Sequence, residues 1–122
     1  MSDFLILANA NELIRIPAGS LIYVTSDGNY SDIYTRDREK RTVTLQLGVI
    51  EEQINKQFHD QEQEFVRIGK SLIVNLQFLH YINPSKRQLI LSDNHTFKFH
   101  LEASKEALRQ LKDYLEHIIN KG

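Results

Sequence analysis

Two cations flank a glycine in the stretch FVRIGKSLIVNL, which runs from residue 65 to residue 76. Arg67 and Lys70 lie on either side of Gly69, and an apolar run follows them directly. One explanation is that the apolar residues fill a core, the glycine forms a turn or bulge, and both charged ends extend into water. The other explanation is that the two cations contact an anionic partner. Their spacing alone favours the first explanation.

Residues that could support catalysis or hold a cofactor form none of the usual patterns. The chain has no cysteine, which excludes disulfides, thiolate metal ligands and cysteine nucleophiles. None of its five glycines begins a phosphate-binding loop, and its five histidines lack the spacing of metal ligands. Glu51 and Glu52 are adjacent on a predicted helix surface, whereas a general acid–base pair would need burial. We therefore predict no enzyme, no cofactor, no metal site and no small-molecule substrate.

Charge is distributed unevenly along a chain whose formal net charge is only −1. Between residues 51 and 64, five acids against one lysine give −4, and between residues 65 and 101, five bases against one acid give +4. A basic segment of this kind can attract nucleic-acid phosphates although the whole chain is nearly neutral. Both cations of the opening stretch belong to this basic segment.

Length and composition indicate a folded domain. A chain of 122 residues with 41% hydrophobic and 25% charged residues can bury a core of its own. The apolar run near the N-terminus is too short to cross a bilayer and lacks the basic flank and cleavage site of a signal peptide. Together with the absence of cysteine, these features predict a cytoplasmic protein with no membrane partner.

Hydrophobic patterning predicts a mainly β fold of the α+β type, with about ten strands in small antiparallel sheets and two helices. Strand-like segments, separated by turn residues such as Asn9–Asn11 and Asp27–Asn29, continue to about Gln46. Apolar residues at three- and four-residue steps then predict a short helix near residues 47–58. Strands return from residue 65, and a second amphipathic helix is predicted near residues 104–120, with Ser104 as its cap.

Three segments in fixed order carry a family resemblance: LIYVTSDGNYSDIYT, TVTLQLGVIEEQI and FVRIGKSLIVNLQFLHYI. Together they resemble the LytTR DNA-binding domain of bacterial transcription regulators. The similarity is strongest over residues 12–101 of a single predicted domain, 1–122. It implies an elongated arrangement of small antiparallel sheets that presents loops, rather than a recognition helix, to successive major grooves of double-stranded DNA. The implied function is sequence-specific DNA binding in transcription regulation, as the output domain of a response regulator.

The resemblance also implies roles for individual residues. Asn29 falls in the first reading loop beside Tyr30, and Lys70 falls in the second. Asparagine can pair with adenine, and lysine can donate to guanine O6 and N7. Arg67 and Ser71 are better suited to phosphates, which position a protein without specifying sequence. On this interpretation, the two cations lie at the edge of the core because DNA passes across it.

The third reading loop departs from the family pattern. It falls on Phe97–Glu102, where Leu101 occupies the position of the usual arginine. Glu102 adds a negative charge that phosphates repel. We expect Lys98 and His100 to replace the missing contact if their side chains point outward.

These departures leave an alternative function open. Besides the third loop, Gly69 stands where the family commonly has histidine, so the second loop loses a donor and gains freedom. The alternative is a LytTR-like scaffold that has lost DNA binding and acts as a protein-interaction or dimerisation module. Homodimerisation through the C-terminal helix is compatible with either function, and homodimerisation on repeated DNA half-sites is compatible with the DNA-binding function. The helix carries an apolar stripe that indicates packing on a sheet, and the first four of its residues also alternate as in a coiled-coil seam. The stripe consists of Leu108, Leu111, Leu115, Ile118 and Ile119.

Overall fold

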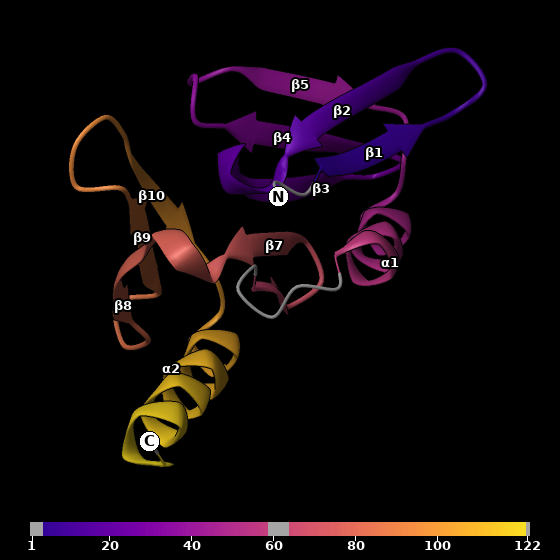
Figure 1. The fold of residues 1–122 in the computed structure, drawn as a ribbon. Helices are drawn as coiled ribbons and strands as arrows, with labels where there is room; N and C mark the ends of the chain where they lie inside the picture. The colour runs from indigo at the N-terminus through magenta and orange to yellow at the C-terminus, as the bar shows by residue number, and fades with distance from the viewer. Residues whose placement is uncertain (1–3, 59–63, 122) are drawn as a thin grey trace. The chain divides into compact units, whose positions relative to one another are not determined.

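Ten β-strands and two α-helices make up the part of the chain that the computed structural model describes, residues 4–58 and 64–121, with side chains as far as residue 118 (Figure 1). Their order is β1 (Phe4–Ala8), β2 (Leu13–Pro17), β3 (Leu21–Asp27), β4 (Tyr30–Thr35), β5 (Lys40–Val43), α1 (Leu47–Gln57), β6 (Phe65–Ile68), β7 (Leu72–Asn75), β8 (Leu79–Asn83), β9 (Gln88–Ser92), β10 (Lys98–Glu102) and α2 (Lys105–Lys121). Two short 3-10 helices, η1 (Ala18–Ser20) and η2 (Leu76–Phe78), also occur. The predicted β-rich class, the number of strands and both helices are confirmed.

The chain divides into two compact units, Met1–Gln77 and Phe78–Gly122. The first unit contains a five-stranded antiparallel sheet in the order β5-β4-β3-β7-β6 and a separate β1–β2 hairpin. The second contains a three-stranded antiparallel sheet in the order β10-β9-β8, together with α2. Each unit therefore has its own sheet and its own helix.

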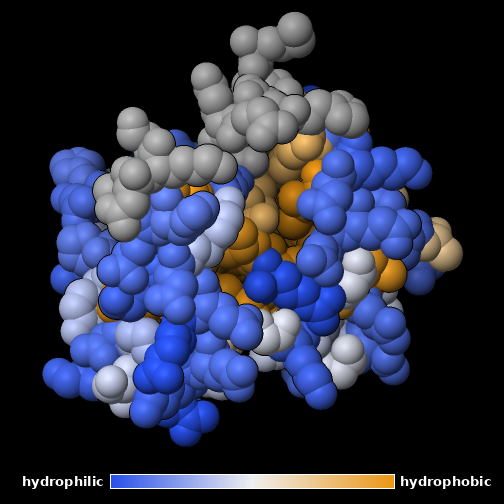
Figure 2. Space-filling model, turned by 90° about the horizontal axis from the view of Figure 1, so that it is seen from below, coloured by the Kyte–Doolittle hydropathy of each residue, from blue (hydrophilic) through white to orange (hydrophobic). Residues whose placement is uncertain are grey.

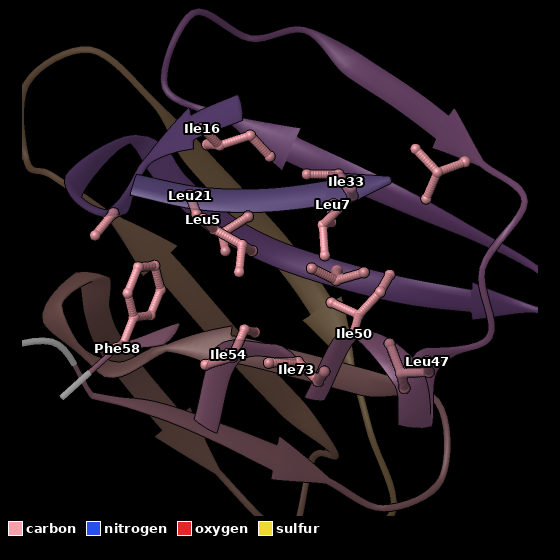
Figure 3. Packing of buried hydrophobic residues seen from close by; sticks show 13 residues of the cluster. Leu5, Leu7, Ile16, Leu21, Ile33, Leu47, Ile50, Ile54, Phe58 and Ile73 are labelled. Atoms are coloured by element: carbon pink, nitrogen blue, oxygen red, sulfur yellow. The ribbon is translucent and has the colours of Figure 1, made fainter. Parts of the chain in front are cut away.

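The core of the first unit lies between the five-stranded sheet, the β1–β2 hairpin and α1. Figure 3 shows side chains from all three gathered in this core, among them Leu5 and Leu7 of the hairpin, Ile50 and Ile54 of α1, and Ile73 of β7. Each of these five is at most 4% exposed. Burying an aliphatic side chain stabilises a fold by about 1.5–3 kcal/mol. This core therefore fixes α1 against the sheet whose turns are described below.

The segment between β5 and α1 differs from the sequence prediction. The strand was predicted to continue to about Gln46, but β5 ends at Val43. The hydroxyl of Ser31 on β4 donates to the carbonyl of Leu45 at 2.7 Å, so a side chain rather than a backbone pair holds this segment to the sheet. Gln46 is then the N-cap residue of α1. A local turn, rather than strand pairing, therefore leads into the helix.

The second unit packs α2 against β8. Leu89 and Leu91 of β9 are fully buried, and Leu108 and Leu111 of α2 are buried as well. The hydroxyl of Ser104 caps α2 by accepting a bond from the N–H three residues later, at 3.1 Å, as the sequence predicted. The first half of the apolar stripe along α2 thus packs inward, which was one of its two predicted roles.

Polar residues cover most of the face shown in Figure 2, although hydrophobic residues also reach that surface. In the described part of the chain, no helix is long and apolar enough to cross a membrane. Those same residues contain no cluster of three or more His, Asp or Glu that could hold a metal ion. The large hydrophobic side chains that are at least 39% exposed are Ile6, Leu13, Tyr30, Val49, Tyr81, Tyr114 and Ile118.

Candidate nucleic-acid interface

Two hairpin turns lie at the same end of the five-stranded sheet. The β3–β4 turn contains Asn29, and the β6–β7 turn contains Lys70. Strands β3 and β7 are antiparallel neighbours, so the end of β3 lies beside the start of β7. The N–H of Ser26 donates to the carbonyl of Ser71 at 2.9 Å and ties the two hairpins together close to their turns. Residues more than forty positions apart in sequence therefore share one edge.

The β3–β4 turn is a two-residue loop, as its sequence predicted. Asp27 pairs with Tyr30 across the loop, and Gly28 has a φ of +66°. A positive φ at the first loop position alone is the pattern of a type II′ turn, which favours glycine there. The side chains of Asn29 and Tyr30 are both exposed, Tyr30 to 49%. The turn thus presents an amide and a phenol to solvent.

The amide of Asn29 has a partner from another element. Its Oδ1 accepts a hydrogen bond from Nε2 of Gln46 at 3.2 Å. Gln46 precedes α1 and makes no capping bond with its side chain. The bond leaves the NH₂ group of Asn29 and one further acceptor position of Oδ1 for another molecule. Gln46 therefore orients the Asn29 side chain at the edge of the sheet.

The β6–β7 turn is held by Arg67. Nη1 of Arg67 lies 3.0 Å from Oε1 of Glu51 on α1, and Nη2 donates to the carbonyl of Lys70 at 2.9 Å. Gly69 has a φ of +63°, which is the left-handed region that favours glycine. The side chains of Lys70 and Ser71 are exposed. One guanidinium thus fixes the turn to the helix while the ammonium of Lys70 projects into solvent.

The segment expected as a third reading loop is instead strand β10, apart from Phe97. Lys98, His100 and Glu102 are exposed, and Phe99 and Leu101 between them are half-buried. Strand alternation causes this pattern, because successive side chains point to opposite faces of a sheet. Lys98 and His100 therefore point outward, which was the condition for their predicted role, whereas Leu101 turns inward.

The seven candidate residues consequently form two groups. Asn29, Tyr30, Arg67, Lys70 and Ser71 belong to the first unit and cluster at one end of its sheet. Lys98 and His100 belong to the second unit, on one face of β10.

Sequence reasoning missed two residues of the interface, Gln46 and Glu51. Gln46 contacts a turn that lies seventeen residues earlier, and Glu51 contacts a strand residue sixteen positions later. The sequence placed Glu51 on the solvated face of a helix, which is correct, since its side chain is 39% exposed. Helical periodicity does not indicate which neighbour an outward carboxylate meets. Only the packing of α1 on the sheet brings Arg67 within reach.

The loop between β9 and β10 is braced by Asp93. Its Oδ1 accepts bonds from the N–H groups of His95, Thr96 and Phe97 at 2.9, 2.7 and 3.1 Å. Desolvation raises the pKa of this carboxyl, but the hydroxyl of Thr96 and these N–H groups outweigh it and hold the pKa well below its usual range. The aspartate is therefore ionised and holds the chain that leads into Lys98.

Comparisons with known proteins agree with this geometry. The family model described as the LytTr DNA-binding domain matches residues 11–116. A solved structure, the "LytTr DNA-binding domain of putative methyl-accepting/DNA response regulator from Bacillus cereus", is similar with a TM-score of 0.61 and 17% sequence identity. The similarity covers 93% of this chain and 96% of that chain. No curated protein matches.

The structural similarity shows that the two chains share a fold, and the family model extends the region of resemblance from residue 101 into α2. The resemblance carried by the three ordered sequence segments is thereby confirmed. The general activity that this family supports is DNA binding in regulation. The chain belongs to the LytTr family of DNA-binding domains.

Proposed function

We propose that this domain binds double-stranded DNA in a sequence-specific manner and reads major grooves through the turns between its strands. The observation that carries the proposal is the edge shared by the β3–β4 and β6–β7 turns, which the bond from Ser26 to Ser71 holds together. Both turns present exposed polar side chains there. Gln46 bonds to the side chain of Asn29, and Arg67 bonds to the backbone carbonyl of Lys70. Rigid presentation matters because a base contact needs defined donor and acceptor positions.

Asn29 and Lys70 are the residues that we assign to base edges. The free NH₂ and remaining acceptor position of Asn29 suit adenine N7 and N6, and the ammonium of Lys70 suits guanine O6 and N7. Tyr30 and Ser71 carry hydroxyl groups at the same edge, and hydroxyls bond readily to phosphate oxygens. Each turn thus combines one group that reads sequence with one that fixes position.

Arg67 is assigned a different role from the phosphate contact that the sequence suggested. Its guanidinium is already bonded to Glu51 and to the Lys70 carbonyl, so a phosphate would have to compete with a carboxylate. We assign Arg67 as a positioning residue that holds the turn carrying Lys70. Lys98 and His100, exposed on β10, are assigned to DNA contacts of the second unit, in place of the arginine that Leu101 replaces.

The biological setting follows from the family. A LytTr domain acts in regulation, and the similar structure from Bacillus cereus is described as part of a response regulator. We propose that the chain acts as one DNA-binding domain over residues 1–122, in the bacterial cytoplasm, as the output domain of a response regulator and without catalytic activity.

Homodimerisation through α2 is a second proposal, and Ile118 favours it. This residue continues the apolar stripe of the helix but is 43% exposed, whereas Leu108 is fully buried. A second copy could cover the exposed end of the stripe. Ile118→Glu should then reduce the molecular mass measured by sedimentation equilibrium from dimer to monomer. A monomeric wild type at high concentration would contradict the proposal.

DNA reading can be tested without knowledge of the natural operator. Duplexes selected from a random library would be compared with scrambled duplexes by fluorescence anisotropy, for wild type, Asn29→Ala and Lys70→Ala. We expect wild type to prefer the selected duplex and both variants to lose much of that preference. Lys56→Ala is the matched control, because Lys56 is an exposed cation on α1 outside the shared edge.

Two results would contradict the proposal. One is selection that yields no preferred duplex for wild type. The other is a preference that survives in both variants. A preference lost equally in Lys56→Ala would show that overall charge, rather than the shared edge, controls binding.

A further inference from the structure

The turn between β8 and β9 carries two adjacent cations, Lys86 and Arg87, to which no role has been given above. We propose that these two residues, which line a hollow with His100 of β10, give the second unit an additional contact with the phosphate backbone of DNA. This inference rests on the proposed DNA-binding function and adds to it a site for affinity rather than for sequence.

The backbone of this turn is fixed at several points. The N–H of Lys86 donates to Oδ1 of Asn83 at 3.1 Å, and the N–H of Arg87 donates to the carbonyl of Pro84 at 3.0 Å. The carbonyl of Arg87 accepts a longer bond of 3.4 Å from the N–H of Ala103, which follows β10. These hydrogen bonds therefore fix the backbone of Lys86 and Arg87.

A shallow hollow of about 230 Å³ lies beside this turn. Gln88 pairs with Glu102 across β9 and β10, so the start of one strand and the end of the other form its walls. The hollow can hold a phosphate group, because its volume is several times the roughly 30 Å³ that a water molecule occupies in the liquid. The residues that line the hollow are Lys86, Arg87, Gln88, Leu89, His100, Leu101 and Glu102.

The charges around the hollow are left available for an anion. In the part of the chain that the structure describes, neither Lys86 nor Arg87 forms an ion pair, even though Glu102 lines the same hollow. Both side chains are exposed. A phosphate would thus gain a bidentate arginine and an ammonium without displacing a carboxylate from either. Glu102 lowers the positive electrostatic potential at the hollow but forms an ion pair with neither Lys86 nor Arg87.

Further polar side chains lie on the same face of the sheet. Tyr81 on β8 and His100 on β10 both pair with Ile90 of β9, and residues directly opposite each other point to one face. Lys98 lies two residues before His100 and therefore shares that face. The polar surface is thus wider than a single small anion requires, which favours an extended polyanion, the DNA backbone, as its occupant.

Salt dependence of binding tests this proposal, because each phosphate contact contributes about 0.9 to the slope of log affinity against log salt concentration. The variant would combine Lys86→Ala with Arg87→Asn, since asparagine tolerates the φ of +58° at position 87 better than alanine does. We expect the slope to become shallower by about 1.8, so that the loss of affinity between 50 and 200 mM salt is roughly tenfold smaller than for wild type. The ratio of affinities for selected and scrambled duplexes should not change.

The matched control removes two cations from α2 of the same unit, Arg109→Ala with Lys112→Ala. Its slope should stay close to that of wild type, because neither residue lines the hollow. Glu102→Gln supplies a change in the opposite direction, with tighter binding to both duplexes at low salt.

Three outcomes would overturn the proposal. These are a wild-type slope in the Lys86/Arg87 variant, an equal change in the α2 control, and a loss of sequence preference in place of a change in slope. In each of them wild type still prefers its selected duplex, so the proposed function stands. If wild type shows no salt-dependent binding to any duplex, both proposals fail together.

Discussion

Arg67 in the first unit and Arg87 in the second are both exposed arginines beside a tight turn, yet their surroundings differ. The guanidinium of Arg67 is bonded to a carboxylate and to a carbonyl of its own turn. Arg87 has no ion-pair partner among the described residues and lines an open hollow. We therefore propose that the partners a cation already has within the protein, rather than its residue type, decide whether it contacts DNA.

This difference suggests a division of work between the two units. In the first, an arginine and a glutamine are used internally, and they hold turns whose tips carry Lys70 and Asn29. In the second, Lys86 and Arg87 form no ion pair among the described residues and lie in the turn beside the outer face of the sheet. We therefore expect changes in the first unit to alter sequence preference and changes in the second to alter overall affinity. The following predictions test that contrast, beginning with the largest expected effect.

Lys70→Ala should have the largest effect on discrimination. Loss of one good base contact costs about 1–3 kcal/mol, which corresponds to roughly 5- to 150-fold in preference for the selected duplex. Binding to a scrambled duplex should weaken much less, since only one charge is lost. Lys86→Ala is the comparison in the second unit, and it should weaken binding to both duplexes by the same factor. Fluorescence anisotropy titrations at a single salt concentration measure both effects.

Arg67→Ala should reduce preference by a smaller factor while leaving the salt slope unchanged. The turn would lose its link to α1, and Lys70 would sample more positions, but no phosphate contact would disappear. Arg67→Lys should fail to restore preference, because one ammonium cannot reproduce the two directed bonds of the guanidinium. A slope that falls by about 0.9 in Arg67→Ala would instead assign this residue to a phosphate.

Glu51→Gln changes the partner of Arg67 and so distinguishes whether Arg67 positions the turn or contacts a phosphate. If Arg67 positions the turn, Glu51→Gln should weaken the bond between Arg67 and α1 and slightly lower the preference for the selected duplex. If Arg67 contacts phosphate, removal of the competing carboxylate should tighten binding to both duplexes. The sign of the change, measured in the same titrations, distinguishes the two.

The sequence could predict most of the fold because its signals are local. Apolar spacing located α1 and α2, and glycine with asparagine at 28 and 29 located the β3–β4 turn. The end of β5 was predicted wrongly, and the bond from Ser31 to the carbonyl of Leu45, just beyond the strand, joins residues fourteen apart. The composition of residues 96–100 predicted a strand, which β10 confirms, whereas the resemblance had implied a reading loop at 97–102.

The site was less predictable than the fold for the same physical reason. Exposed candidates such as Asn29 and Lys70 could be named from resemblance. The contacts that decide the role of Arg67, however, join a helix, a strand and a turn, and no spacing in the sequence encodes them. Likewise, the hollow beside Lys86 exists only because β9 and β10 pair in a register that sets Gln88 opposite Glu102.

Gly69→Ala should destabilise the first unit rather than alter its chemistry. A left-handed φ costs a residue with a side chain about 1–2 kcal/mol, and the φ here is +63°. A Cβ at this position would meet no atom within 4 Å, so the cost should come from the backbone alone. Urea denaturation should show this loss, and Gly69→Asn should lose less. Equal stability of all three proteins would contradict the observed turn.

The smallest predicted effect compares two carboxylates that each brace a turn, Asp37 in the first unit and Asp93 in the second. The hydroxyl of Thr35 and the N–H of Glu39 lower the pKa of Asp37. Asp93 receives three N–H bonds as well as the hydroxyl of Thr96. In both cases the folded-state pKa lies below the unfolded value of about 3.8, so the stabilisation is complete above that pH and is lost progressively as the pH falls from there through the folded-state pKa.

Thermal melting between pH 7 and pH 2.5 should therefore show wild type losing its advantage over Asp93→Asn as the solution becomes acidic. The same should hold for Asp37→Asn with a smaller initial advantage, because fewer donors hold that carboxylate. The difference in melting temperature between wild type and each variant should narrow towards the acid end, and some of it should remain for Asp93→Asn, because the folded-state pKa of Asp93 lies below that range. A difference in melting temperature that stays constant over the whole range would mean that the side chain of the aspartate stabilises the fold through its shape rather than its charge. The β9–β10 loop of the second unit would then be held without a contribution from that charge.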